Sequence, residues 1–215
     1  MTTPFASPPV GRRLRSRPHG DEREGRILAT AERLLAERPL QDISIGELAA
    51  GAGISRPTFY FYFASKEDVL IALVENVVDE AEATIARLFS GPPIDRTERW
   101  RGVIQGYHDV FGAHRRLTVT LIESRHTSPR LSAVWAGVQN YWVENTARTI
   151  EAERRHGRAP DGIPTRDLAT ALLLLNERVI QADLAAEPER LEHDAVVPTL
   201  LHLWHTAIYG VPPAG

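Results

Sequence analysis

Between residues 43 and 67 the sequence contains two helix starts separated by a glycine-rich turn. Ser44 and Glu47 stand three residues apart, which is the spacing of a capping box at the start of a short helix. Gly51-Ala52-Gly53 then predicts a tight turn, because glycine adopts backbone angles that other residues avoid. Ser55 follows as a candidate N-cap, and Pro57 suits the first turn of the next helix. Two short helices joined in this way, after a longer one, predict a helix-turn-helix.

The longer helix is predicted from Asp21 onward, and Pro39 ends it. Its apolar residues recur at spacings of three and four, as a helix with one buried face requires: Ile27, Leu28, Ala31, Leu34 and Leu35. Behind the helix-turn-helix, Ser65 and Asp68 form a second capping box at the start of another helix. The region 21–66 therefore predicts a small helical domain.

The rest of the chain also has a helical pattern, with breaks expected at 91–93, 125–129, 157–164 and 187–188. Pro129 suits the first turn of a long helix that Gly157 ends. Pro198 leaves two alternatives: the last helix starts there, or it is kinked. Alternating strand patterns are absent, so we expect an all-α fold of about nine helices.

Charge is distributed unevenly along the chain. Residues 1–66 carry a net charge of +3 and the remainder carries −6, which suits a protein that touches nucleic-acid phosphates at one end. Residues 1–20 contain four arginines and no acid, and predict a disordered basic arm that follows a phosphate backbone or serves only as a solubilising tail. The arginines are Arg12, Arg13, Arg15 and Arg17. The domains expected are thus 1–20, 21–66 and 67–215.

Several classes of protein are disfavoured by the composition. The sequence has no cysteine, which excludes disulfides, thiolate nucleophiles and cysteine-ligated metals. No apolar stretch approaches the roughly 20 residues of a membrane span, and there is no apolar core of a signal peptide. We therefore expect a cytoplasmic protein without membrane contact.

The stretch from Ile43 to Glu67 resembles the signature of the TetR family of transcriptional regulators. Within that family, the run Ser55 to Phe63 (SRPTFYFYF) is most similar to the EthR subgroup, and the likeness continues at 167–172, 176–178 and 208–210. The resemblance implies a TetR-like fold and a homodimer that binds double-stranded operator DNA. It also implies a recognition helix from about Ser55 to Phe61, and pairing of the last two long helices across the dimer.

The predicted DNA-binding residues combine this resemblance with side-chain chemistry. Ser55, Arg56 and Thr58 carry groups that bind base edges or nearby phosphates. We expect Tyr60, Tyr62 and Lys66 to contact the phosphate backbone of the DNA. We expect Phe59 and Phe63, which lie in the same stretch, to be part of the core, because phenylalanine is usually buried. Besides the four arm arginines, the predicted residues are Ser44, Ser55, Arg56, Pro57, Thr58, Tyr60, Tyr62 and Lys66.

The region 67–215 is expected to sense a small apolar effector. Aromatic residues at helical spacing are typical of a plain core, but in the subgroup that the chain resembles, the matching positions line an elongated apolar tunnel. Asn176 follows an apolar run, where its amide needs a hydrogen-bond partner or a ligand. The predicted lining residues are Trp100, Val103, Ile104, Tyr107, Phe111, Trp135, Gln139, Trp142, Asn145, Thr146, Leu173, Asn176 and Trp204.

The chain also departs from the subgroup at four positions in this region. Leu173 replaces a polar amide, Gln139 an apolar residue, Gln181 an aromatic residue and Asn145 a tyrosine. The identity of the effector therefore cannot be transferred from the resemblance.

Two alternatives to a ligand-responsive repressor are a constitutive DNA-binding protein and a helical enzyme. His202 and His205 lie on one helical face, but no metalloprotease, phosphate-loop or nucleophile-elbow motif accompanies them. We therefore predict no catalytic residue, no metal and no cofactor.

Overall fold

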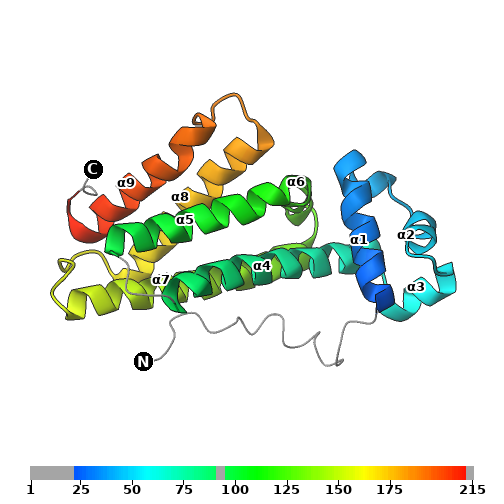
Figure 1. Ribbon diagram of the computed structural model, residues 1–215, viewed down its shortest axis with the longest axis horizontal. Helices are drawn as coiled ribbons and strands as arrows, with labels where there is room; N and C mark the ends of the chain where they lie inside the picture. The colour runs from blue at the N-terminus through cyan, green and yellow to red at the C-terminus, as the bar shows by residue number, and fades with distance from the viewer. Residues whose placement is uncertain (1–21, 91–94, 212–215) are drawn as a thin grey trace. The chain divides into compact units, whose positions relative to one another are not determined.

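The computed structural model describes residues 22–90 and 95–211, and within these ranges it contains nine α-helices, two short 3-10 helices and no strand (Figure 1). The helices are α1 Glu22–Glu37, α2 Ile45–Gly51, α3 Arg56–Tyr62, α4 Lys66–Ser90, α5 Arg96–Ala113, α6 Arg115–Arg125, α7 Pro129–Arg155, α8 Thr165–Ala185 and α9 Val196–Tyr209, with η1 Leu40–Asp42 and η2 His193–Ala195 between them. The predicted all-α fold is confirmed. None of the described helices has the length and apolarity that a membrane span requires.

The described residues group into two compact units. The head unit comprises the described part of Pro8–Val78 together with His114–Trp135, and the body unit comprises Asp79–Ala113 with the described part of Ala136–Gly215. Helices α4 and α7 contribute residues to both units. The boundary predicted at residue 66 coincides with the start of α4 and stays a prediction. The predicted arm at 1–20 and the predicted break at 91–93 lie outside the described residues.

The head unit is built on the apolar face of α1. Ile27, Ala31, Leu34 and Leu35 are buried there, and α1 packs against α2 and α6 while α2 packs against α3 (Figure 1). At the end of α2, a Cβ on Gly51 would lie 2.3 Å from the Cγ2 atom of Thr30 on α1. Only glycine therefore allows the two helices to approach this closely.

The body unit is centred on α9. This helix packs along α5 and also contacts α8, burying the side chains of Trp204, Leu200 and Leu201 (Figure 1). Helices α8 and α9 each end at a residue with left-handed backbone angles, Ala186 with a φ of 55° and Gly210 with a φ of 75°. Such a residue satisfies the last carbonyls of a helix and prevents its continuation.

Most of the predicted helix boundaries agree with the structure. Helix α7 begins at Pro129 and ends at Arg155, and Gly157 follows it with a φ of 66°. Pro198 lies in the first turn of α9, which begins at Val196. Of the two alternatives for Pro198, the structure thus supports a helix start, where the missing N–H donor leaves no bond unmade.

Candidate DNA-binding helix and helical body

Local capping fixes α3 in the head unit. The Oγ atom of Ser55 accepts a hydrogen bond from the backbone N–H of Thr58 at 3.3 Å and lies 2.8 Å from the Oγ1 atom of Thr58. Pro57 stands in the first turn, and the backbone N–H of Phe63 closes the last turn on the carbonyl of Phe59 at 3.0 Å. The helix start predicted from Ser55 and Pro57 is confirmed.

The side chains of α3 separate into a buried face and an outer face. Phe59 is fully buried and Phe63 nearly so, which confirms their predicted place in the core. Tyr60 is 47% exposed and Phe61 69% exposed, and Arg56 lies with its Nη2 atom 3.5 Å from the Oη atom of Tyr60. Ser55, Arg56 and Pro57 are exposed, whereas Thr58 and Tyr62 are half-buried. The outer face thus carries hydroxyl, guanidinium and aromatic groups, although contact with DNA stays a prediction.

Phe61 was not among the predicted DNA-binding residues. An exposed phenylalanine of this extent on a short helix is unusual, because phenylalanine is among the residues most often buried. Helical spacing was the available signal: Phe59 and Phe63 share a face, and Phe61 between them cannot point to the same side.

A capping box with an added ion pair fixes the start of α2. Glu47 accepts hydrogen bonds from the backbone N–H of Ser44 at 2.9 Å and from its hydroxyl at 2.8 Å, and Arg38 pairs with the same carboxylate at 2.5 Å. These bonds lower the pKa of Glu47 to about 2, and the hydrogen bond from the Ser44 backbone contributes most to this lowering. Ser44, a predicted DNA-binding residue, is exposed, but its hydroxyl is engaged in this cap.

Lys66, at the start of α4, binds the turn that precedes α2. Its ammonium Nζ atom donates to the backbone carbonyls of Leu40 at 2.8 Å, Gln41 at 3.2 Å and Ile43 at 2.6 Å. An ammonium group has three donors, and three carbonyls converge on it here. We therefore expect Lys66 to position this turn. The sequence pattern instead predicts that Lys66 contacts the phosphate backbone of DNA.

In the body unit, two buried tryptophans, one on α5 and one on α9, donate hydrogen bonds to other buried side chains. The indole N–H of Trp204 donates to the Oδ1 atom of Asn176 on α8 at 2.8 Å, and that of Trp100 donates to the hydroxyl of Tyr209 at 3.0 Å. The two indole rings lie with their centroids 5.2 Å apart. Asn176 therefore has a hydrogen-bond partner within the fold, which was one of the two roles considered for its amide.

A second aromatic group joins α5 to α7. Tyr107 stacks on Phe111 with a centroid distance of 4.4 Å, and Trp142 meets Tyr107 edge-on at 5.1 Å and Phe111 at 6.2 Å. Aromatic pairs in these geometries stabilise a core by about 0.5–1.5 kcal/mol beyond the area they bury. The body thus contains two aromatic groups, one joining α5 to α9 and one joining α5 to α7.

The two parts of the chain match two family models. Residues 27–73 match "Bacterial regulatory proteins, tetR family", and residues 100–210 match "Transcriptional regulator EthR, C-terminal domain". The HTH-type transcriptional regulator EthR of Mycobacterium tuberculosis is 47% identical over 214 residues, covering 98% of this chain and 99% of that protein. The chain belongs to the TetR family. It is a DNA-binding transcriptional regulator of the EthR type and not an enzyme.

Two further relatives of this TetR-family chain agree. EthR of Mycolicibacterium smegmatis is 44% identical over 207 residues, covering 96% of this chain and 95% of the relative. Among solved structures, a putative TetR-family regulator from Syntrophomonas wolfei superimposes with a TM-score of 0.74 at 20% identity, covering 87% of this chain and 95% of that one. The structural likeness shows the TetR fold.

All of the predicted effector residues lie inside the matched EthR domain. Buried among them are Trp100, Ile104, Phe111, Trp142, Asn145, Thr146, Asn176 and Trp204, whereas Val103, Tyr107, Gln139 and Leu173 are half-buried. Trp135 is also buried, but it belongs to the head unit, where the guanidinium carbon of Arg125 lies 5.8 Å from its ring centroid. The structure therefore gives no support for grouping Trp135 with the aromatic residues of the body.

Two of the predicted polar lining residues are engaged within this TetR-family fold. The amide of Asn145 donates to the carbonyl of Tyr141 at 3.0 Å and accepts from Arg148 at 2.5 Å. Gln139 donates to Glu177, which also accepts from Gln181 at 2.7 Å. Glu177 and Tyr209 were not predicted, because Glu177 bonds Gln139, 38 residues away, and Tyr209 bonds Trp100, 109 residues away.

Histidines 202 and 205 do not form a site together. His205 is buried, with its Nε2 atom 3.3 Å from the Oγ1 atom of Thr97 and its Nδ1 atom 2.8 Å from the carbonyl of Val211. His202 is exposed. On α9, the side chain of His205 therefore lies in the core and that of His202 lies at the surface.

Proposed function

We propose that this protein is a homodimeric repressor that a small apolar effector releases from its operator. The observation that carries the DNA-binding part is the outer face of α3, where a capped helix presents Ser55, Arg56 and Thr58 beside the exposed rings of Tyr60 and Phe61. Short polar side chains and arginine at a helix N-terminus are the groups that reach base edges in the major groove.

The proposed dimer pairs α8 and α9 with their counterparts, as the family resemblance implies. Leu174 on α8 is 57% exposed and Leu203 on α9 is 42% exposed, whereas the other leucines of the two helices are buried or half-buried. Exposed apolar side chains on neighbouring helices favour a protein interface. The substitution Leu203→Glu should yield monomers in analytical ultracentrifugation and abolish tight operator binding, whereas a dimeric Leu203→Glu variant would exclude α9 from the interface.

In the proposed complex, the two copies of α3 enter successive major grooves, so the half-sites stand about one helical turn apart, or a multiple of it. Thr58→Ala removes one hydroxyl of the outer face and should cost about 1–3 kcal/mol in specific binding, with little change on non-specific DNA. The control is Thr127→Ala, because the exposed hydroxyl of Thr127 bonds the carbonyl of Ser124 within its own turn. Equal losses on specific and random duplexes would assign Thr58 to α3 stability instead.

The proposed effector binds among the aromatic groups of the body. Support comes from the matched EthR domain and from the two aromatic groups that it contains, Trp100 with Trp204 and Tyr107 with Phe111 and Trp142. A ligand that prefers one dimer geometry changes DNA affinity only by its differential affinity, commonly about 1–3 kcal/mol or roughly 5- to 150-fold.

Dodecanol and dodecanoic acid are suitable elongated probes for this test. The effector proposal expects either probe to quench tryptophan fluorescence, raise the thermal midpoint and release operator DNA over one concentration range. Asn176→Leu, which removes the partner of Trp204, should shift all three curves together. Quenching while operator affinity stays constant would favour the alternative, a constitutive DNA-binding protein whose body binds compounds without switching.

A further inference from the structure

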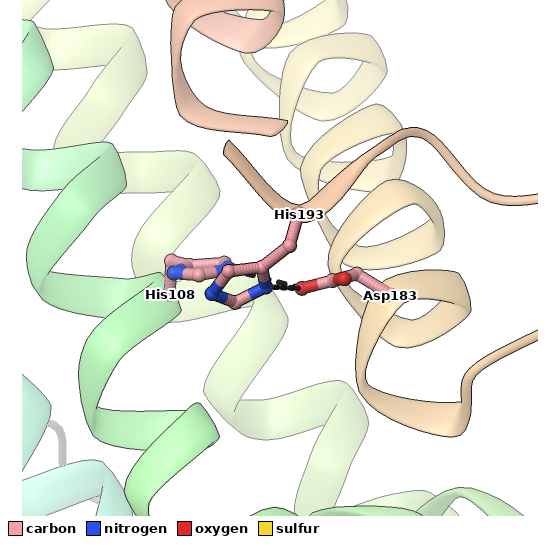
Figure 2. Close-up of side chains that lie close together, drawn as sticks. All are labelled: His108, Asp183 and His193. Atoms are coloured by element: carbon pink, nitrogen blue, oxygen red, sulfur yellow. Dashed lines mark hydrogen bonds and ion pairs between the residues drawn. The ribbon is translucent and has the colours of Figure 1, made fainter. Parts of the chain in front are cut away.

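Three side chains converge where α5, the last turn of α8 and η2 meet in the body unit (Figure 2). One carboxylate oxygen, Oδ2 of Asp183, lies 3.1 Å from the Nε2 atom of His108 and 2.9 Å from the Nδ1 atom of His193. The ligand atoms of all three residues lie within 4.8 Å of one another. His108 and Asp183 are buried, whereas the side chain of His193 is 71% exposed.

A second carboxylate lies beside the other ring nitrogen of His108. Its Nδ1 atom lies 3.4 Å from Oδ1 of Asp109, an oxygen that also accepts from Gln105 at 2.7 Å. An imidazole that donates its Nδ1–H to Asp109 presents a lone pair at Nε2, which then faces the oxygen of Asp183. Metal-binding histidines have this arrangement, with the second ring nitrogen held by a carboxylate.

The distances suit a first-row transition ion. Ligand atoms of a tetrahedral ion with bonds of about 2.0 Å stand about 3.3 Å apart, so the two separations from Asp183 need only a slight opening, and the nitrogens of His108 and His193 lie within 4.8 Å of each other. Two imidazole nitrogens and one carboxylate oxygen form a donor set that zinc accepts, with a further position for water. The exposed side of His193 gives an ion access from solvent.

We propose that His108 Nε2, Asp183 Oδ2 and His193 Nδ1 form a binding site for a divalent transition ion of the Zn²⁺ type. The ion ties the segment before α9 to α5 and to the end of α8, which are three separate parts of the body unit. The three residues belong neither to α3 nor to either aromatic group, and the site does not depend on the proposed repressor function.

The test is a titration of Zn²⁺ into chelator-treated full-length protein without an affinity tag. Wild type should bind one ion per chain at this site, with a rise in thermal midpoint on addition of Zn²⁺. His193→Ala should weaken this binding by about tenfold or more and abolish the thermal shift, and Asp109→Asn should weaken it by about 10- to 100-fold. The matched control is His202→Ala, an exposed histidine of the same unit outside the cluster.

Substitution by another ligand locates the ion without depending on a loss. His193→Cys should still bind Co²⁺ and should add a sulfur-to-cobalt charge-transfer band that wild type and His202→Ala lack. Equal Zn²⁺ affinity in wild type and His193→Ala, or a cysteine variant without this band, would overturn the proposal. In that case the three residues form only a hydrogen-bonded cluster, with protons between their atoms.

Discussion

Replacing Lys66 by methionine tests whether its ammonium holds the head unit together. Methionine keeps most of the apolar stem and removes only the charged donors, so packing along the stem changes little. Three backbone carbonyls, those of Leu40, Gln41 and Ile43, lose their common donor. These carbonyls belong to the turn between α1 and α2, and the turn sets where α2 begins.

The expected loss follows from the setting of each bond. The bond to Gln41 is exposed, and water replaces it at little cost. The bonds to Leu40 and Ile43 are partly buried, and at about 1.5 kcal/mol each for a charged donor the loss is about 3 kcal/mol. For a chain of this length such a loss lowers the thermal midpoint by about 6–12 °C.

Two measurements separate this structural role from a phosphate contact. Thermal unfolding followed by circular dichroism should show the drop in Lys66→Met, with Lys66→Arg in between, because a planar guanidinium cannot direct three donors from one nitrogen. The salt dependence of operator binding should keep its slope, whereas loss of one phosphate contact would reduce the slope by about 0.9. A methionine variant as stable as wild type but with the reduced slope would refute the reasoning.

Two further predictions concern α2 and its packing. Because the pKa of Glu47 falls from 4.5 to about 2 on folding, its carboxylate stabilises the head above pH 4.5, and this contribution is lost as the pH falls from about 4.5 towards 2. The stability difference between wild type and Glu47→Gln in urea unfolding should therefore be smaller at pH 4 than at pH 7, and a constant difference would contradict it. Gly51→Ala should destabilise by about 1–3 kcal/mol through its clash with Thr30, whereas Gly25→Ala, with no atom within 4 Å, should be neutral or stabilising.

The local features of the head could be predicted from the sequence. The caps at Ser44, Ser55 and Ser65 depend on residues three positions apart, so their geometry is set within one helical turn. Phe59 and Phe63 could be placed in the core because helical spacing puts them on one face. Local hydrogen bonds and periodicity therefore account for the helix-turn-helix.

Contacts between distant segments could not be predicted in this way. Trp204 and Asn176 are 28 residues apart, and Trp100 and Tyr209 are 109 apart. No spacing rule connects such pairs, since they depend on how whole helices pack. The same limit applies to the three carbonyl partners of Lys66, which lie at least 23 residues earlier in the sequence.

Lys66 is also the only lysine in the sequence. The chain therefore offers a single side-chain amine to reagents that acylate amines. Among the described residues, the three acceptors that this amine contacts belong to the turn before α2. Acylation of the nitrogen requires that it first lose a proton and leave the three carbonyls. The rate at which such a reagent labels Lys66 thus reports how often the head opens, and a DNA duplex that holds the head closed should slow the labelling.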